Sequence, residues 1–305
     1  GIVDINKSGN GYVKNDVFKA DVFVSKKNIA NSLNNDLVCV QITKKNNSRV
    51  EGRVIKVKKR GQIRFIGVIE KINNDGFFIP EDKKVNTHFF VPKNRLNAAK
   101  DKDRVLLKLT DWPLSAKNPF GQVIRVLKSE TSLKEEIQNN IDLFGVRTTF
   151  NSKIEKELLK ITNSINDKNV KTRTDFRKDK TFTIDPVDAK DFDDALSIKT
   201  NNDSITVGIH IADVSHYVPA NSEIDKEASL RAFSVYFPGL VIPMIPEKLS
   251  NEICSLNPNE DKLCFSVVVT IDPRSYAVKS HWVGKTIINS NKRFTYNEAE
   301  KIIVE

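Results

Sequence analysis

The hydrophobic and polar positions of the first 128 residues alternate over short runs, and turn residues separate these runs. Alternation with a period of two predicts β-strands that bury one face, and the glycine-containing turns predict hairpins between them. Residues 63–128 repeat the order found in residues 1–62: a glycine turn, an aromatic strand, a Phe-Val strand and a longer closing strand. Such a repeat indicates two similar small β-barrels in succession. The aromatic residues at the matching positions are Tyr12, Phe23, Phe77 and Phe89.

The pattern changes after the second repeat. Over residues 129–171 the apolar positions recur at helical spacing, and Ser132 with Glu135 has the form of a capping box. We therefore expect a helical connector that packs against the domain after it. Beyond it, strand-like and helix-like runs are mixed, and residues 205–211 alternate as a clear strand. The chain beyond residue 171 is therefore expected to contain both strands and helices.

Basic residues are concentrated in the part of the chain that contains the barrels. The net charge is +10; residues 1–128 contain 26 Lys or Arg against 12 Asp or Glu, and the remaining residues contain 23 against 27. A basic half joined to an acidic half is typical of a protein that grips a polyanion with one part and processes it with the other. An AT-rich genome also enriches Lys and Asn, so charge alone does not decide. Rings framed by lysines suit the bases of single-stranded nucleic acid, although such rings more often belong to a core.

Composition excludes several classes of protein. No apolar run reaches the length of a membrane span and no signal peptide opens the chain, so we expect a cytoplasmic protein without membrane contact. The three cysteines form no Cys-x-x-Cys pair and there are only four histidines, which argues against a zinc site. The first residues read as the interior of a domain, so we interpret the chain as a fragment at its N-terminus.

The most informative stretch is acidic and spans residues 183–195. Five carboxylates fall within ten residues, and apolar residues rather than Lys or Ser stand between them. Packed carboxylates need a counter-charge, which hard divalent cations supply through oxygen ligands. A solvated loop or a calcium site is the ordinary alternative, but the spacing does not fit an EF-hand loop. Two divalent ions about 3.5–4 Å apart form the usual clamp for hydrolysing a phosphodiester.

The sequence motif of this stretch is Asp-Pro-x-x-Ala-x-Asp-x-Asp-Asp-Ala, beginning at Asp185. It resembles the signature of the RNB catalytic domain of the ribonuclease II/ribonuclease R family, with every acidic position filled. Asp188 lies at a variable position and receives no role. Later motifs, among them His-Ile-Ala-Asp-Val-Ser and Val-Tyr-Phe-Pro-Gly, resemble the same family. The resemblance runs from residue 172 to the last residue. More loosely, the two barrels resemble the paired cold-shock domains that precede this domain in ribonuclease R.

The resemblance implies a multidomain protein with two small all-β OB-fold barrels of the cold-shock type before a C-terminally truncated α+β RNB domain. It implies processive, hydrolytic removal of 5′-nucleoside monophosphates from the 3′ end of single-stranded RNA by a monomer. In that family Tyr236 corresponds to the tyrosine that stacks on the 3′-terminal base, and Asp213 and His210 are expected to contact RNA or support the metal cluster. The four barrel aromatics are expected to bind RNA. The implied ligands of Mg²⁺ or Mn²⁺ are Asp185, Asp191, Asp193 and Asp194.

Some family features have no counterpart in the chain. The family's active site also uses an arginine and a glutamate from later in the RNB domain, and an S1 domain lies beyond it, so we expect these 305 residues alone to be inactive. A non-catalytic RNA-binding pseudo-nuclease is the main alternative, but it would be favoured by a missing acidic position, and none is missing. An aspartate-based phosphatase needs Thr or Val where Ala195 stands. A purely structural acidic loop would not explain the later sequence motifs that resemble the family.

Overall fold

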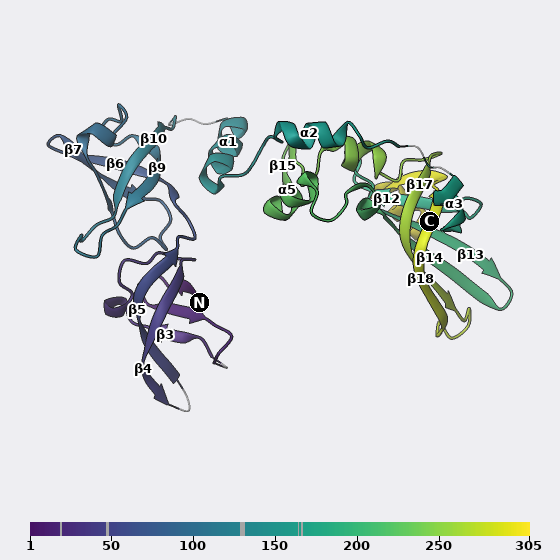
Figure 1. Cartoon of the computed structure of the whole chain (residues 1–305), viewed down its shortest axis with the longest axis horizontal. Helices are drawn as coiled ribbons and strands as arrows, with labels where there is room; N and C mark the ends of the chain where they lie inside the picture. Colours follow the sequence, from purple (N-terminus) through teal and green to yellow (C-terminus); the bar gives the residue numbers. More distant parts are fainter. Residues whose placement is uncertain (19, 47–48, 129–131, 164, 166) are drawn as a thin grey trace. The chain divides into compact units, whose positions relative to one another are not determined.

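The chain divides into two compact units, Gly1–Val146 and Arg147–Glu305. Figure 1 shows the first unit as two barrels with a helix and the second as a sheet with shorter helices around it. The computed structural model describes residues 1–18, 20–46, 49–128, 132–163, 165 and 167–305.

The first unit begins with a closed five-stranded barrel in which the strands follow the order β1-β2-β3-β5-β4. Val3, Val13 and Val22 are buried in its core, as the alternation predicts. The last strand presents Lys56 and Lys58 to solvent, so part of the basic stretch is strand rather than linker. The elements are β1 (Ile2–Ile5), β2 (Gly11–Lys14), β3 (Val22–Val24), the 3₁₀ helix η1 (Lys26–Asn28), β4 (Leu37–Asn46) and β5 (Arg49–Lys59).

The second barrel repeats the topology of the first. Read from its first strand, its order is β6-β7-β8-β10-β9, which matches the first barrel strand for strand. Phe78 and Phe89 are fully buried at its centre. The two predicted barrels of OB type are therefore confirmed. The elements are β6 (Arg64–Ile72), β7 (Asp75–Pro80), β8 (Phe89–Val91), the 3₁₀ helix η2 (Lys93–Arg95), β9 (Arg104–Asp111) and β10 (Phe120–Val126).

Helix α1 (Leu133–Phe144) completes the first unit. The predicted capping box is present: the side chain of Ser132 accepts a hydrogen bond from the backbone N–H of Glu135 at 3.3 Å. Arg64 of the second barrel donates to the carbonyl oxygen of Asp142 at 2.7 Å. The expectation that the connecting helices pack on the following domain is therefore wrong for α1, which packs on the barrel before it.

The second unit is built on a mixed seven-stranded sheet with the order β11-β18-β17-β14-β13-β12-β19. Strands β12 and β19 pair in parallel, although more than 100 residues separate them along the chain. The strands are β11 (Thr174–Asp175), β12 (Thr181–Asp185), β13 (Asp194–Asn201), β14 (Ser204–Ala212), β17 (Asp261–Ile271), β18 (Val278–Asn289) and β19 (Lys292–Thr295).

Helices and one short hairpin accompany this sheet. The helices are α2 (Ser152–Leu158), α3 (Asp167–Lys171), α4 (Val214–Tyr217), α5 (Glu223–Arg231), the π-helix η3 (Lys248–Ile253) and α6 (Tyr296–Val304). The hairpin consists of β15 (Val235–Phe237) and β16 (Leu240–Ile242). Within the described ranges no helix is long and apolar enough to cross a membrane.

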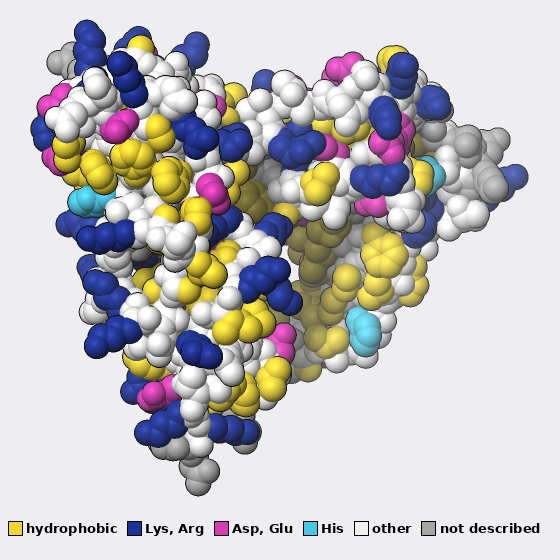
Figure 2. All heavy atoms as spheres, turned by 60° about the vertical axis from the view of Figure 1, so that its left-hand side comes forward, with side chains coloured by type: hydrophobic (Ala, Val, Ile, Leu, Met, Phe, Trp, Pro, Cys, Tyr) yellow, Lys and Arg dark blue, Asp and Glu magenta, His cyan; other side chains and the backbone are white. Residues whose placement is uncertain are grey.

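The two faces of the sheet differ in burial. On one face Cys264 and Ser266 of β17 are fully buried, and Cys264 belongs to a buried cluster that includes apolar residues of the helices. On the other face Ile209, Val267 and Val283 lie side by side across β14, β17 and β18, and each is between 37% and 51% exposed. Figure 2 shows hydrophobic side chains at the surface of this unit.

Candidate functional site

The acidic stretch forms the connection between β12 and β13. Asp185 is the last residue of β12 and Asp194 the first of β13, so the carboxylates gather where the two strands separate. The loop between them is anchored to the body of the unit through Phe192. The ring of Phe192 is buried, its N–H donates to Ser255 Oγ at 3.1 Å, and its carbonyl accepts from the N–H of Leu256 at 2.9 Å. The apolar residues within the stretch therefore fix where its charges lie.

These side chains line one hollow of about 700 Å³ within the second unit. Its acidic wall is made by the four carboxylates of the signature, and the β15–β16 hairpin forms another wall. Tyr236 on that hairpin is 63% exposed, and its hydroxyl donates to Asp191 Oδ2 at 2.7 Å. This hydrogen bond is the main cause that raises the pKa of Tyr236. The signature carboxylates that line the hollow are Asp185, Asp191, Asp193 and Asp194.

The electrostatics of the hollow are those of crowded anions. Burial raises the pKa of Asp185, and the charges of Asp194 and Asp191 raise it further. The pKa of Asp193 is also raised. The larger cause is partial desolvation of its carboxyl group, and the negative charges of the other three carboxylates add to it. A bound cation would relieve this repulsion.

The donor set has the right chemistry for a hard divalent ion. All four groups offer carboxylate oxygens, and Asp185 Oδ2 is buried without a hydrogen-bond partner. In the described part of the chain, however, no three Asp, Glu, His or Cys side chains are already arranged to hold an ion. The residues fit Mg²⁺ or Mn²⁺ by type.

Two of the predicted site residues lie away from the hollow. His210 is fully buried, and its ring nitrogens lie 2.7 and 2.9 Å from the hydroxyl oxygens of Ser266 and Ser197. Burial lowers the pKa of His210 to about 4, so the ring is neutral at pH 7. The hydrogen bonds that it makes within the sheet are those of a structural residue.

Asp213 is likewise satisfied by protein groups. Its carboxylate accepts hydrogen bonds from Arg173 Nη2 at 2.5 Å and from Ser215 Oγ at 2.8 Å, and both members of the Arg173–Asp213 pair are 3% exposed. Burial alone would raise the pKa of Asp213, but these hydrogen bonds together with the positive charges of Arg173 and Lys285 outweigh it and hold the pKa below its ordinary value. The structure does not bring Asp213 together with the four signature carboxylates.

Arg293 is a site residue that the sequence did not reveal. It stands on β19, and its Nη2 donates to the carbonyl oxygens of Pro186 and Val187 in the acidic loop. Its guanidinium lies 4.9 Å from the centre of the Phe192 ring, and its charge lowers the pKa of Asp185 against the larger effect of burial. No local signal could have identified it, because its position depends on the parallel pairing of β19 with β12.

Three of the four barrel aromatics predicted to bind RNA reach the surface, and their contact with RNA stays a prediction. Tyr12 and Phe23 lie 5.6 Å apart between ring centres, and Arg49 lies 3.8 Å above the Phe23 ring. Phe77 also reaches the surface. Phe89 is the correction: it is fully buried in the second barrel, and its neighbour Phe90 is the ring that pairs with Phe77, at 5.7 Å.

Figure 2 shows Lys and Arg side chains over the visible face of the first unit, around these barrels. Rings flanked by cations are a surface on which bases stack while phosphates are neutralised. The arrangement suits single-stranded nucleic acid.

Three family models match the chain, and they correspond to the first barrel, the second barrel and the second unit. Residues 173–305 match the family model described as RNB domain, residues 77–151 that of a cold shock domain, and residues 1–57 that of the ribonuclease B OB domain. Together these three matches account for most of the chain.

Curated relatives cover nearly all of the chain. Ribonuclease R of Aquifex aeolicus is 34% identical over 93% of the chain and 40% of its own length. Ribonuclease R of Thermotoga maritima is 34% identical over 99% of the chain and 43% of its own length. The chain thus spans less than half the length of these relatives.

Solved structures give the same result. Mycoplasma genitalium RNase R in complex with ribose-methylated single-stranded RNA is 25% identical with a TM-score of 0.80, over the whole chain and 48% of that structure. Yeast Ssd1, described as a pseudonuclease, has a TM-score of 0.81 at 20% identity, over the whole chain and 45% of its own length. At that identity the likeness to Ssd1 concerns the fold alone.

Proposed function

Because this chain belongs to the RNB family of ribonucleases, we propose that the whole protein is a 3′–5′ exoribonuclease. It hydrolyses single-stranded RNA processively to 5′-nucleoside monophosphates. The observation that carries the proposal is the hollow of the second unit, where four signature carboxylates and Tyr236 face one space. The Mycoplasma genitalium relative was solved with single-stranded RNA, which supports the same class of substrate.

Asp185, Asp191, Asp193 and Asp194 would hold Mg²⁺ or Mn²⁺. When bound, these ions supply Lewis-acid activation of a water and neutralise charge at the departing 3′ oxygen. The buried Asp185 Oδ2, which has no hydrogen-bond partner, offers a ready ligand position. Tyr236 presents an exposed ring at the rim, where it can stack on the 3′-terminal base once its hydroxyl leaves Asp191.

The barrels bind the RNA strand on its way to this hollow. The paired rings of each barrel supply stacking surfaces, and the Lys and Arg residues around them attract the phosphates. We further propose that the protein acts as a monomer in the cytoplasm.

A second candidate is an RNA-binding pseudo-nuclease. The fold of Ssd1 shows that this architecture also occurs without nuclease activity. The complete set of four carboxylates favours the enzyme, and a direct experiment separates the two.

The experiment uses the full-length protein, a 5′-labelled single-stranded RNA, the equivalent DNA, and Mg²⁺ or EDTA. A ladder that shrinks from the 3′ end, on RNA only, and that EDTA abolishes supports the enzyme. Asp193→Asn should abolish this ladder while leaving RNA binding nearly unchanged, because the carboxylate coordinates ions and the barrels grip the strand.

Asp188→Asn is the matched control. Asp188 lines the same hollow, is exposed and lies at a variable position of the signature, so its loss should leave the ladder intact. Tight binding without any shortening of the RNA would assign the protein to the RNA-binding class. Equal loss of binding and cleavage in Asp193→Asn would contradict the proposal that the carboxylates coordinate ions while the barrels bind the RNA.

A further inference from the structure

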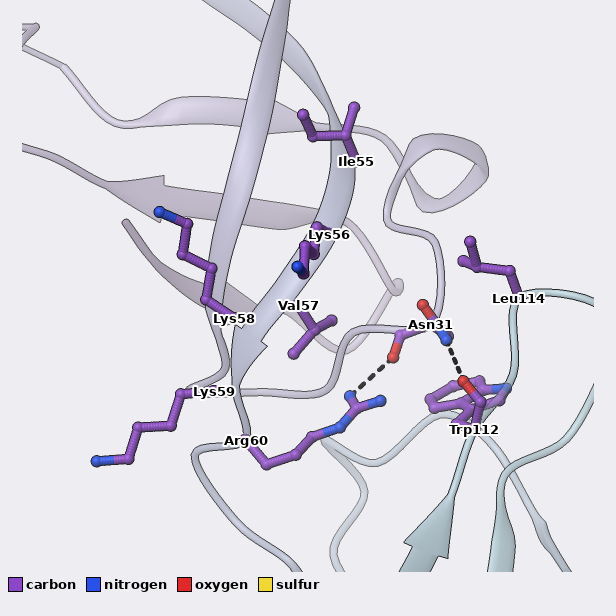
Figure 3. Close-up of a pocket in the computed structure, with 9 residues that line it drawn as sticks. All are labelled: Asn31, Ile55, Lys56, Val57, Lys58, Lys59, Arg60, Trp112 and Leu114. Atoms are coloured by element: carbon purple, nitrogen blue, oxygen red, sulfur yellow. Dashed lines mark hydrogen bonds between the residues drawn. The ribbon is translucent and has the colours of Figure 1, made fainter.

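A second hollow lies within the first unit, where the end of β5 faces the second barrel. It measures about 300 Å³. Figure 3 shows β5 along one side, with Lys56 and Val57, and Trp112 and Leu114 on the other. Trp112 belongs to the segment that follows β9 of the second barrel, so the hollow exists only because the two barrels meet.

The joint between the barrels is held by a chain of hydrogen bonds. The side-chain amide of Asn31 donates to the carbonyl oxygen of Trp112. Arg60 donates to the carbonyl oxygen of Asn31 at 2.8 Å and to Asp36 Oδ2 at 2.6 Å, and Asp36 is fully buried. These bonds fix Trp112 relative to β5, so the hollow is preorganised.

The ring of Trp112 can offer a ligand only apolar contacts. Its indole N–H already donates to the carbonyl oxygen of Ala116 at 3.2 Å, and the Arg60 guanidinium lies over the ring, 5.7 Å from its centre. The ring is half-buried, because part of it packs against the core of the second barrel. Leu114 beside it is 79% exposed and Val57 lies across from it. What remains for a ligand is the solvent-facing part of the Trp112 ring together with Leu114, beside a cation. Such a combination suits a base.

The charges around the hollow are of one sign. Lys56, Lys58, Lys59 and Arg60 line it, and among the residues that the structure describes no acid does. Asp36, which pairs with Arg60, is itself buried. In Figure 3 Lys58 and Lys59 extend away from Trp112, which places their charges outside the hollow, where a phosphate chain would run.

We propose that this hollow binds one nucleotide of a single-stranded RNA, with its base against Trp112 and Leu114 and its phosphates on the lysines of β5. The inference rests on the proposed function and adds a binding position to it. A volume of about 300 Å³ is at the lower end of the range for small-ligand sites and suits a single nucleotide. An acidic peptide would satisfy the lysines, but it would leave the apolar surface of half-buried Trp112 and exposed Leu114 unused.

The position is separate from the aromatic face of the first barrel. Phe23 pairs with Glu51 near the start of β5, whereas Lys56 stands five residues further along the same strand. At strand spacing this is roughly 16 Å. A strand of RNA that stacks on Phe23 can therefore continue along β5 and enter the joint between the barrels.

The test follows the fluorescence of Trp112. The chain has two tryptophans, so Trp282→Phe leaves Trp112 as the sole emitter. The 305-residue chain with this change is titrated with oligo(A) RNA of six nucleotides and, separately, with poly-glutamate, a polyanion without bases. Saturable quenching of Trp112 by the RNA but not by poly-glutamate supports the site.

Leu114→Asp is compared with Leu133→Asp in this background. Both leucines are exposed residues of the first unit, and both changes add one negative charge, but Leu133 lies on α1 and does not line the hollow. Leu114→Asp should weaken RNA binding roughly tenfold, as expected for loss of one stacked base, and Leu133→Asp should not.

Three results would overturn the proposal, and they are distinguishable. RNA that binds, as judged from the anisotropy of a labelled strand, without changing Trp112 emission would remove the site and leave the proposed function intact. Equal quenching by poly-glutamate would show that the hollow takes polyanions without recognising bases. No RNA binding at all would count against the proposed function itself.

Discussion

The buried Arg173–Asp213 pair provides a sharp test of how the second unit is held together. We consider Arg173→Met, which keeps the length of the side chain and removes its charge. Besides its bond to Asp213, Arg173 Nη1 donates to the carbonyl oxygens of Cys264 and Thr286 at 3.0 and 3.3 Å. The variant therefore leaves one buried carboxylate and two carbonyl oxygens without their donor.

Removing one partner of a buried ion pair costs about 3–5 kcal/mol of the free energy of unfolding. We expect a value of about 3 kcal/mol, because Ser215 still donates to Asp213 and Lys285, half exposed at 4.0 Å, can move closer. In a unit of this size each kcal/mol lowers the melting temperature by about 2–4 °C, so the expected shift is roughly 6–12 °C.

The loss should depend on pH in a defined direction. The native pKa of Asp213 is held below its ordinary value, so the stability that this carboxylate contributes is present above the unfolded pKa of about 3.9. It is lost as the pH falls through the lower, folded pKa. The difference between the wild type and Arg173→Met should therefore be largest near neutral pH and should shrink in acid.

The measurement is hydrogen exchange of the β14 and β17 amides as a function of urea, which reports on the second unit alone. Arg177→Met is the matched control, because Arg177 pairs with Asp175 at 2.7 Å near the same edge of the sheet but is partly exposed. An exposed pair is worth about 0–1 kcal/mol. Equal losses in the two variants, both below about 1 kcal/mol, would refute the reasoning.

Three further predictions concern single side chains. Phe90→Ala should weaken binding of single-stranded RNA roughly tenfold in a filter-binding assay with little change in stability, whereas Phe89→Ala should cost about 3–5 kcal/mol in urea denaturation because it empties a core site. Arg293→Ala should lower the affinity for Mg²⁺ measured by calorimetry, because the loop carbonyls lose their donor, and an unchanged affinity would remove Arg293 from the site. His210 should titrate near pH 4 by NMR, and protonation close to pH 6.5 would show that the ring is not enclosed by the sheet.

The barrels could be predicted because their signals are local. Glycine turns and alternating positions stand next to one another in the sequence, and each barrel forms from neighbouring strands. The exception is instructive: Phe89 and Phe90 are adjacent in a strand of three residues, and a shift of one residue exchanges the buried and the surface ring. The repeat identified the strand but not which ring faces solvent.

The candidate site was predicted in part for the same reason. Its four carboxylates lie in one short stretch, so the sequence contained the donor set directly. The placement of Arg293 and the pairing of Asp213 with Arg173 depend on strands distant in sequence, and no periodic pattern reports such contacts. Likewise, the capping box located the start of α1, but helical spacing could not say which domain its apolar side would contact.

The parallel pairing of β12 with β19 has a consequence for protein synthesis. Asp185 pairs with Thr295, so the ribosome must add 110 further residues after the end of β12 before its outer neighbour exists. At roughly 5–20 residues per second this takes about 5–20 s. During that interval the acidic loop has no Arg293 to hold it, while both barrels are complete and able to fold. Until β19 has been made, the nascent chain therefore contains both barrels but lacks the hydrogen bonds that Arg293 donates to the acidic loop.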